Sequence, residues 1–136
     1  MKSIFTIIVV ALFAVGCMEF SQNEVVYDHE LIGTWSDIQW TESGISMTKV
    51  KKLEKNTYGY IFNANGTLIA RQNSGWCGTP PIITSDYEGT WILENGTIHI
   101  KLDYWGGHTT QEWQIANSSN KKVTINIANQ EYHSKN

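Results

Sequence analysis

The chain has 136 residues and a formal net charge of −3 at pH 7, with ten basic residues against thirteen acidic ones. This length leaves room for one folded domain with one hydrophobic core. The single arginine and the small number of lysines argue against nucleic-acid binding, which depends on clustered basic side chains. Six tryptophans, six tyrosines and four phenylalanines are a heavy aromatic content, and aromatic residues favour β-strands.

The amino terminus predicts export. Residues 1–16 are interpreted as a signal peptide, because a basic start precedes an apolar stretch over residues 4–15 that is too short to span a bilayer. The stretch ends in Ala-Val-Gly before Cys17, which resembles the lipobox of bacterial lipoproteins. The resemblance implies that Cys17 is acylated and becomes the first residue of the mature protein. We therefore expect a lipid-anchored protein of the cell envelope, held to its membrane at Cys17 and facing the periplasm or the cell surface.

The rest of the chain divides into a polar tether, residues 17–30, and a folded domain, residues 31–136. The disulfide state depends on the anchor. With a lipid on Cys17, Cys77 has no disulfide partner and the domain folds without a bridge. The alternatives are a bridge from Cys17 to Cys77 in an unlipidated form, and an ordinary secretory signal in which Cys17 has no role.

Short apolar runs separated by turn residues follow one another through the domain, a spacing typical of consecutive β-strands. Asn-Gly pairs at 65–66 and 95–96 predict hairpin turns, because both residues tolerate positive φ. The loop at 73–81 contains two adjacent prolines and cannot be a central strand. The predicted strands lie near residues 33–41, 46–53, 57–62, 67–72, 87–93, 97–102, 109–115 and 123–127, with a further edge strand at 130–133.

These elements predict an all-β fold, an antiparallel up-and-down meander of about eight strands that closes into a barrel. No segment shows a helical pattern. Closure is favoured because an open sheet of aromatic-rich strands would leave unpaired edges that promote aggregation.

The first strand carries the motif Gly33-Thr34-Trp35, which resembles the Gly-x-Trp motif that opens the lipocalin barrel. A second such motif spans Gly89 to Trp91. Together with the two Asn-Gly-Thr turns and the lipobox, these motifs make the chain similar to the lipocalin-like lipoproteins of Gram-negative, Bacteroidetes-type bacteria. The resemblance implies a calycin-type barrel in which Trp35 plugs one end. The chain departs from the lipocalin pattern because no arginine on the last strand stacks over this tryptophan.

Catalysis is not expected from the residues of this chain. A nucleophilic Cys77 would need a histidine base, and the four histidines show no spacing that predicts a base or a metal site. Asp86 and Glu88 lie on one strand face, but alternating acids are typical of a solvated strand face. We therefore expect a protein that is not an enzyme and that holds no cofactor and no metal.

Three aromatic residues beside turns are the candidate ligand contacts at the barrel mouth: Trp76, Tyr104 and Trp105. The leading hypothesis is a lipocalin-like envelope protein that binds a small hydrophobic ligand in its barrel, as the resemblance implies. The alternative is a noncatalytic envelope module that binds a protein or glycan through its loops, and a more remote one is a hydrolase that uses Cys77. A cavity of several hundred cubic ångströms would favour the first hypothesis, and a filled interior the second.

Overall fold

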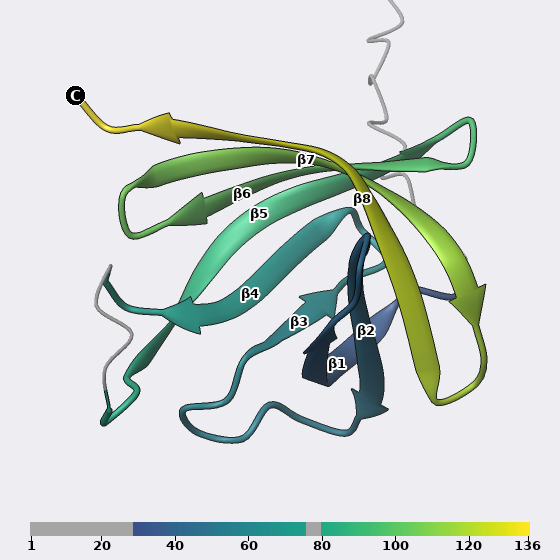
Figure 1. Ribbon diagram of the computed structural model, residues 1–136, viewed down its shortest axis with the longest axis horizontal. Coiled ribbons are helices and arrows are strands. Elements are labelled where there is room, and N and C mark those ends of the chain that lie inside the picture. The colour runs from purple at the N-terminus through teal and green to yellow at the C-terminus, as the bar shows by residue number, and fades with distance from the viewer. Residues whose placement is uncertain (1–28, 76–79) are drawn as a thin grey trace, which may run out of the picture.

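The computed structural model describes residues 29–75 and 80–136 (Figure 1). The predicted signal peptide, Cys17, nearly all of the tether, Trp76 and Cys77 lie outside the described residues. Eight strands follow in chain order: β1 Gly33–Trp40, β2 Gly44–Val50, β3 Gly59–Phe62, β4 Thr67–Asn73, β5 Thr84–Glu94, β6 Thr97–Tyr104, β7 Gly107–Ser118 and β8 Lys122–Ser134. The described part of the chain contains no helix.

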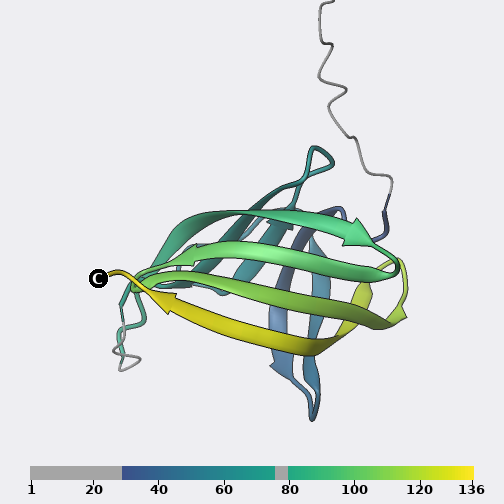
Figure 2. The same cartoon turned by 90° about the horizontal axis from the view of Figure 1, so that it is seen from above.

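The strands close into one barrel in which every neighbouring pair is antiparallel (Figures 1 and 2). The neighbours around the barrel are β1-β2-β8-β7-β6-β5-β4-β3, with β3 returning to β1. The predicted all-β class and the closed barrel of about eight strands are therefore confirmed.

The order of neighbours differs from a simple meander at one place. Strand β1 lies between β2 and β3, so that Trp35 pairs with Lys49 on one side and with Tyr60 on the other. The barrel is closed by β2 against β8. Gly59 makes this arrangement feasible, because a Cβ atom there would lie only 2.4 Å from the Trp35 carbonyl oxygen.

The connection between β2 and β3, residues 51–58, is fixed by Arg71 on β4. Nη1 of Arg71 donates to the carbonyl oxygens of Leu53 and Glu54, both at 3.0 Å. The same guanidinium binds both carboxylate oxygens of Asp86 on β5, at 2.7 and 3.0 Å. This connection, which we call the crossing segment, is thus tied to β4 and β5 on the far side of β3.

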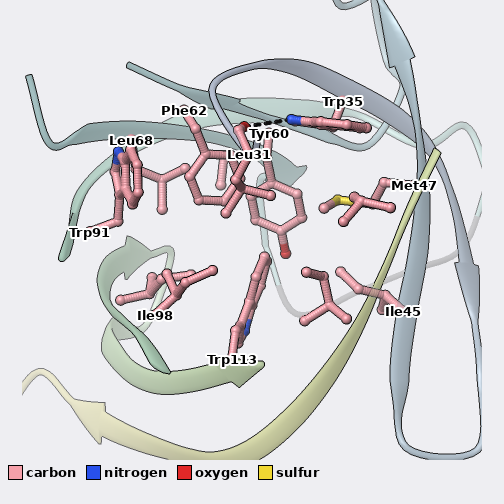
Figure 3. Close-up of a cluster of buried hydrophobic side chains, with 14 of the residues drawn as sticks. Leu31, Trp35, Ile45, Met47, Tyr60, Phe62, Leu68, Trp91, Ile98 and Trp113 are labelled. Atoms are coloured by element: carbon pink, nitrogen blue, oxygen red, sulfur yellow. Dashed lines mark hydrogen bonds between the residues drawn. The ribbon is translucent and has the colours of Figure 1, made fainter. Parts of the chain in front are cut away.

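A cluster of buried hydrophobic side chains forms the core inside the barrel (Figure 3). Strand β6 shows the predicted alternation, with Ile98, Ile100 and Leu102 buried against the interior. The largest buried side chains are aromatic: Trp35, Phe62, Trp91 and Trp113. The ring of Phe62 contacts Trp91 at 5.7 Å and Trp113 at 5.9 Å between centroids, in tilted or edge-on arrangements.

The chain enters the barrel at this packed end. Nε1 of Trp35 donates to the Leu31 carbonyl oxygen at 2.7 Å (Figure 3), and the ring of His29 lies 6.0 Å from Trp91. The β3–β4 turn lies at the same end, because the Trp91 amide donates to the Gly66 carbonyl oxygen at 2.9 Å. We call this the closed end of the barrel.

Strand β8 is longer than the sequence predicts. The two segments expected at 123–127 and 130–133 form one strand with an irregularity at Ala128, since Ile127 lies opposite Trp113 and Asn129 opposite Glu112. An extra residue of this kind bends a strand and changes its twist. The bend separates the half of β8 that pairs with β2 from the half that extends beyond it.

Candidate functional site

A cavity of about 470 Å³ occupies the end of the barrel opposite the closed end. It is lined by the last residues of β1, β4, β6 and β8, which all run toward this end. We call it the open-end cavity.

Unequal strand lengths create this opening. Strands β5, β7 and β8 have 11, 12 and 13 residues, whereas β1, β2 and β3 have 8, 7 and 4. Pairing between β2 and β8 stops at Asn126, so that among the described strands only β7 pairs with β8 beyond the bend. Strand β4 likewise extends two residues past its last pair with β3, which is Arg71 with Gly59. Figures 1 and 2 show the long strands running past the short ones.

The floor of the cavity is polar. Tyr60 of β3 packs edge-on against Trp113, with 5.3 Å between ring centroids, and Gln72 of β4 lines the same cavity. Gln111 of β7 is buried and uses both ends of its amide: Nε2 donates to Oγ1 of Thr109 at 2.9 Å, and Oε1 accepts from Nε1 of Trp113 at 2.8 Å. These groups separate the cavity from the packed core below.

Burial raises the pKa of Tyr60 to about 12, an increase that the hydrogen bond from Gln72 reduces and that Tyr132 adds to. The phenol is therefore neutral at physiological pH. It offers one donor and one acceptor to a ligand without charge.

The rim is aromatic. The ring of Tyr104 meets Trp105 at 5.7 Å and 86° and meets Tyr132 at 5.6 Å and 89°, so Tyr104 stands nearly perpendicular to both rings. Nε2 of Gln130 donates to the Tyr132 hydroxyl at 2.9 Å. Gly106 permits this cluster, because a Cβ atom there would lie 2.6 Å from the Tyr104 ring.

Arg71 is the one charged side chain among the described residues that line the cavity. Its guanidinium is committed to Asp86 and to two carbonyl oxygens. The hydrogen bonds from Arg71 hold the pKa of Asp86 below its ordinary value, and the same bonds raise the pKa of Arg71. The described lining thus presents neutral amide, hydroxyl and aromatic groups to a ligand.

Two of the three predicted mouth residues, Tyr104 and Trp105, line the open-end cavity, and Trp76 lies outside the described residues. The motif residues lie elsewhere. Trp35 and Trp91 are fully buried in the core. Gly89 is packed so closely that a Cβ atom would lie 2.4 Å from the Lys101 carbonyl oxygen, and Gly33 adopts a φ of 131° under the Lys49 side chain.

Sequence reasoning missed the polar groups of the cavity and the partner of Trp35. Gln72, Gln111 and Tyr132 occupy inward positions, and the alternation of side chains on β7 could have revealed Gln111 between Thr109 and Trp113. Nζ of Lys49 lies 5.4 Å from the centre of the Trp35 ring. A lysine of β2 therefore contacts this buried tryptophan.

The described residues hold no group of three or more histidine, cysteine, aspartate or glutamate side chains arranged to bind a metal. Asp86 and Glu88, considered above as a carboxylate pair, lie on the exposed face of β5, and Asp86 is bound to Arg71. No helix in the described part of the chain is long and apolar enough to cross a membrane. Comparison of the chain with family models, with curated proteins and with solved structures gives no significant match.

Proposed function

We propose that this protein is a noncatalytic, lipocalin-like binding module of the cell envelope that holds one small ligand with an apolar surface in the open-end cavity. The observation that carries the proposal is the division of the barrel into a packed half and a hollow half of about 470 Å³. Cavities that bind small ligands measure about 300–1,000 Å³ and combine apolar walls with a few polar groups.

The lining supports an apolar ligand surface. Tyr104, Trp105 and Tyr132 supply aromatic faces at the rim, and Ile45 and Ile127 add aliphatic contacts. The amides of the floor supply the few directional contacts that would fix the orientation of a bound molecule.

The proposed lipid on Cys17 would attach the protein at the end of the barrel opposite the cavity. The described chain begins at His29, at the closed end, and residues 18–28 span at most about 40 Å when fully extended. The cavity opens at the other end of the barrel. In the anchored protein the tether therefore joins the barrel at the end away from the opening, which leaves the opening accessible from the aqueous side.

The alternative, a module that binds a protein through its loops, has one supporting feature. Apolar side chains are exposed around the open end, with Trp40 at 80% and Ile83 at 62% of their full exposure. Exposed apolar groups of this size are typical of contact surfaces. Binding of a ligand in the cavity explains both the exposed apolar rim and the hollow interior, and we therefore favour ligand binding.

The proposal is tested by titrating the purified mature protein with the uncharged fluorescent probe N-phenylnaphthylamine. We expect saturable binding at one site per chain, with quenching of tryptophan emission. Trp105→Ala should weaken binding about threefold to tenfold, since an aromatic contact contributes about 0.5–1.5 kcal/mol. Ile92→Ala is the matched control, because Ile92 is exposed to a similar degree as Trp105 but lies outside the cavity.

Two results would contradict the proposal. One is the absence of saturable binding to protein whose near-ultraviolet circular dichroism shows a packed core. The other is equal weakening by Trp105→Ala and Ile92→Ala, which would place the probe on the outer surface.

A further inference from the structure

The composition of the open-end cavity points to a particular class of ligand. We propose that the cavity takes a neutral saccharide, either a monosaccharide or a short oligosaccharide, in place of an acyl chain. This inference rests on the proposed function, because it names the ligand class of the same site.

The depth of the cavity disfavours an acyl chain. A chain that entered from the rim would end against the Tyr60 hydroxyl and the Gln72 amide, since Trp113 and Phe62 fill the space below. Polar groups that lose water without gaining a partner cost free energy. An acyl site needs an apolar floor, and this floor carries a hydroxyl and an amide.

The charges also disfavour an ionised ligand. A bound carboxylate or phosphate needs a cation or several donors to replace its water. Arg71 is the only charged residue in the described lining, and its guanidinium already holds Asp86 and the carbonyl oxygens of Leu53 and Glu54. A neutral ligand avoids this penalty.

The polar groups match hydroxyl groups, which both donate and accept hydrogen bonds. Oδ1 of Asn73 accepts from the Tyr58 hydroxyl at 2.7 Å, which leaves the Asn73 amide group as a donor. Gln130 donates to Tyr132 and keeps its carbonyl oxygen as an acceptor. The lining therefore has a donor on β4 and an acceptor on β8 for the hydroxyl groups of a sugar.

The aromatic rim matches the other character of a sugar ring, its apolar faces of C–H bonds. Tyr104 stands nearly perpendicular to both Trp105 and Tyr132, so the cluster offers faces in two directions. Aromatic faces bind such surfaces by apolar contact. Aromatic walls above a neutral polar floor thus fit a molecule that is apolar on its faces and polar around its edge.

The test is competition on the purified mature protein. Glucose, N-acetylglucosamine, maltose and cellobiose are added to the protein with bound N-phenylnaphthylamine, and glucuronate serves as the charged counterpart of glucose. We expect at least one neutral sugar to displace the probe and to show saturation-transfer signals in NMR, and we expect glucuronate to bind at least tenfold more weakly than that sugar.

Two glutamines on neighbouring strands provide the matched variants. Gln130→Leu removes an amide from the cavity wall and should weaken sugar binding about threefold to tenfold, the effect of one hydrogen bond. Gln114→Leu removes an exposed amide from β7 outside the cavity and should leave the affinity unchanged. Equal effects of the two variants would overturn the inference.

The outcomes separate the inference from the proposed function. If the probe binds and uncharged acyl compounds such as monoacylglycerols displace it while the sugars do not, the cavity binds ligands but the saccharide assignment is wrong. If neither the probe, the sugars nor the acyl compounds bind to folded protein, both proposals are wrong.

Discussion

Trp35 provides the sharpest test of the closed end. Its side chain is 1% exposed, its Nε1 donates to the Leu31 carbonyl oxygen at 2.7 Å, and Lys49 covers its outer face. Truncation to alanine removes this buried ring and leaves a cavity. It also leaves the Leu31 carbonyl oxygen without its partner.

Replacing a buried tryptophan by alanine costs about 3–5 kcal/mol, and a hydrogen bond contributes about 0.5–1.5 kcal/mol of such a total. We expect Trp35→Ala to lower the free energy of unfolding by about 4 kcal/mol. Because small domains are stable by about 5–15 kcal/mol, this variant could unfold. Trp35→Phe keeps most of the apolar volume, loses the N–H donor and should cost about 1–2 kcal/mol.

The assay is urea unfolding followed by circular dichroism, with Trp105→Ala as the exposed counterpart. For an m-value of about 1–3 kcal/mol/M, a loss of 4 kcal/mol lowers the midpoint by at least about 1 M. Trp105→Ala should change stability by less than about 1 kcal/mol, since the ring is half exposed. If Trp105→Ala were the more destabilising variant, Trp35 would not plug the barrel.

Three further predictions concern the anchor, the crossing segment and the barrel closure. Cys17→Ala should abolish palmitate labelling and release the protein from the membrane fraction. Arg71→Lys should lower the free energy of unfolding by about 1 kcal/mol. The pKa of folded Asp86 is lowered from 3.8, so the difference in unfolding free energy between wild type and Arg71→Lys should be fully present above pH 3.8. It should shrink as the pH falls through the lowered pKa of folded Asp86. Gly44→Ala, whose Cβ would lie 2.0 Å from a β8 carbonyl oxygen, should cost about 2–3 kcal/mol in urea unfolding, and Gly75→Ala less than about 0.5 kcal/mol.

Local features of the fold could be predicted from the sequence, and the pairing of distant strands could not. The alternation of β6 and the hairpin at Asn95-Gly96 depend on adjacent residues, and Asn95 and Gly96 adopt φ values of 50° and 77° as that turn requires. The insertion of β1 between β2 and β3 depends on Arg71 holding Leu53, a contact across 18 positions of the chain. No repeating pattern of residues in the sequence predicts such a long-range contact.

The site was predictable in its aromatic part only. Tyr104 and Trp105 stand beside a Gly-Gly turn, which marks them as residues of a barrel end. The polar floor was not visible because its members, Gln72 and Gln111, lie on separate strands and look like ordinary solvent-facing residues until the register assigns them to the interior. The contact between Lys49 and Trp35 could not be predicted for the same reason, because the two residues lie on different strands, β2 and β1.

The most direct test of the central claim is the location of the bound ligand. NMR spectra of the indole and side-chain amide N–H groups can be recorded while N-phenylnaphthylamine is added to the mature protein. We predict saturable shifts at Trp105 and Gln130 around the open-end cavity, and no comparable shift at Trp35 in the closed end. Shifts confined to groups outside the cavity, or none at saturating probe, would contradict a ligand site at the open end.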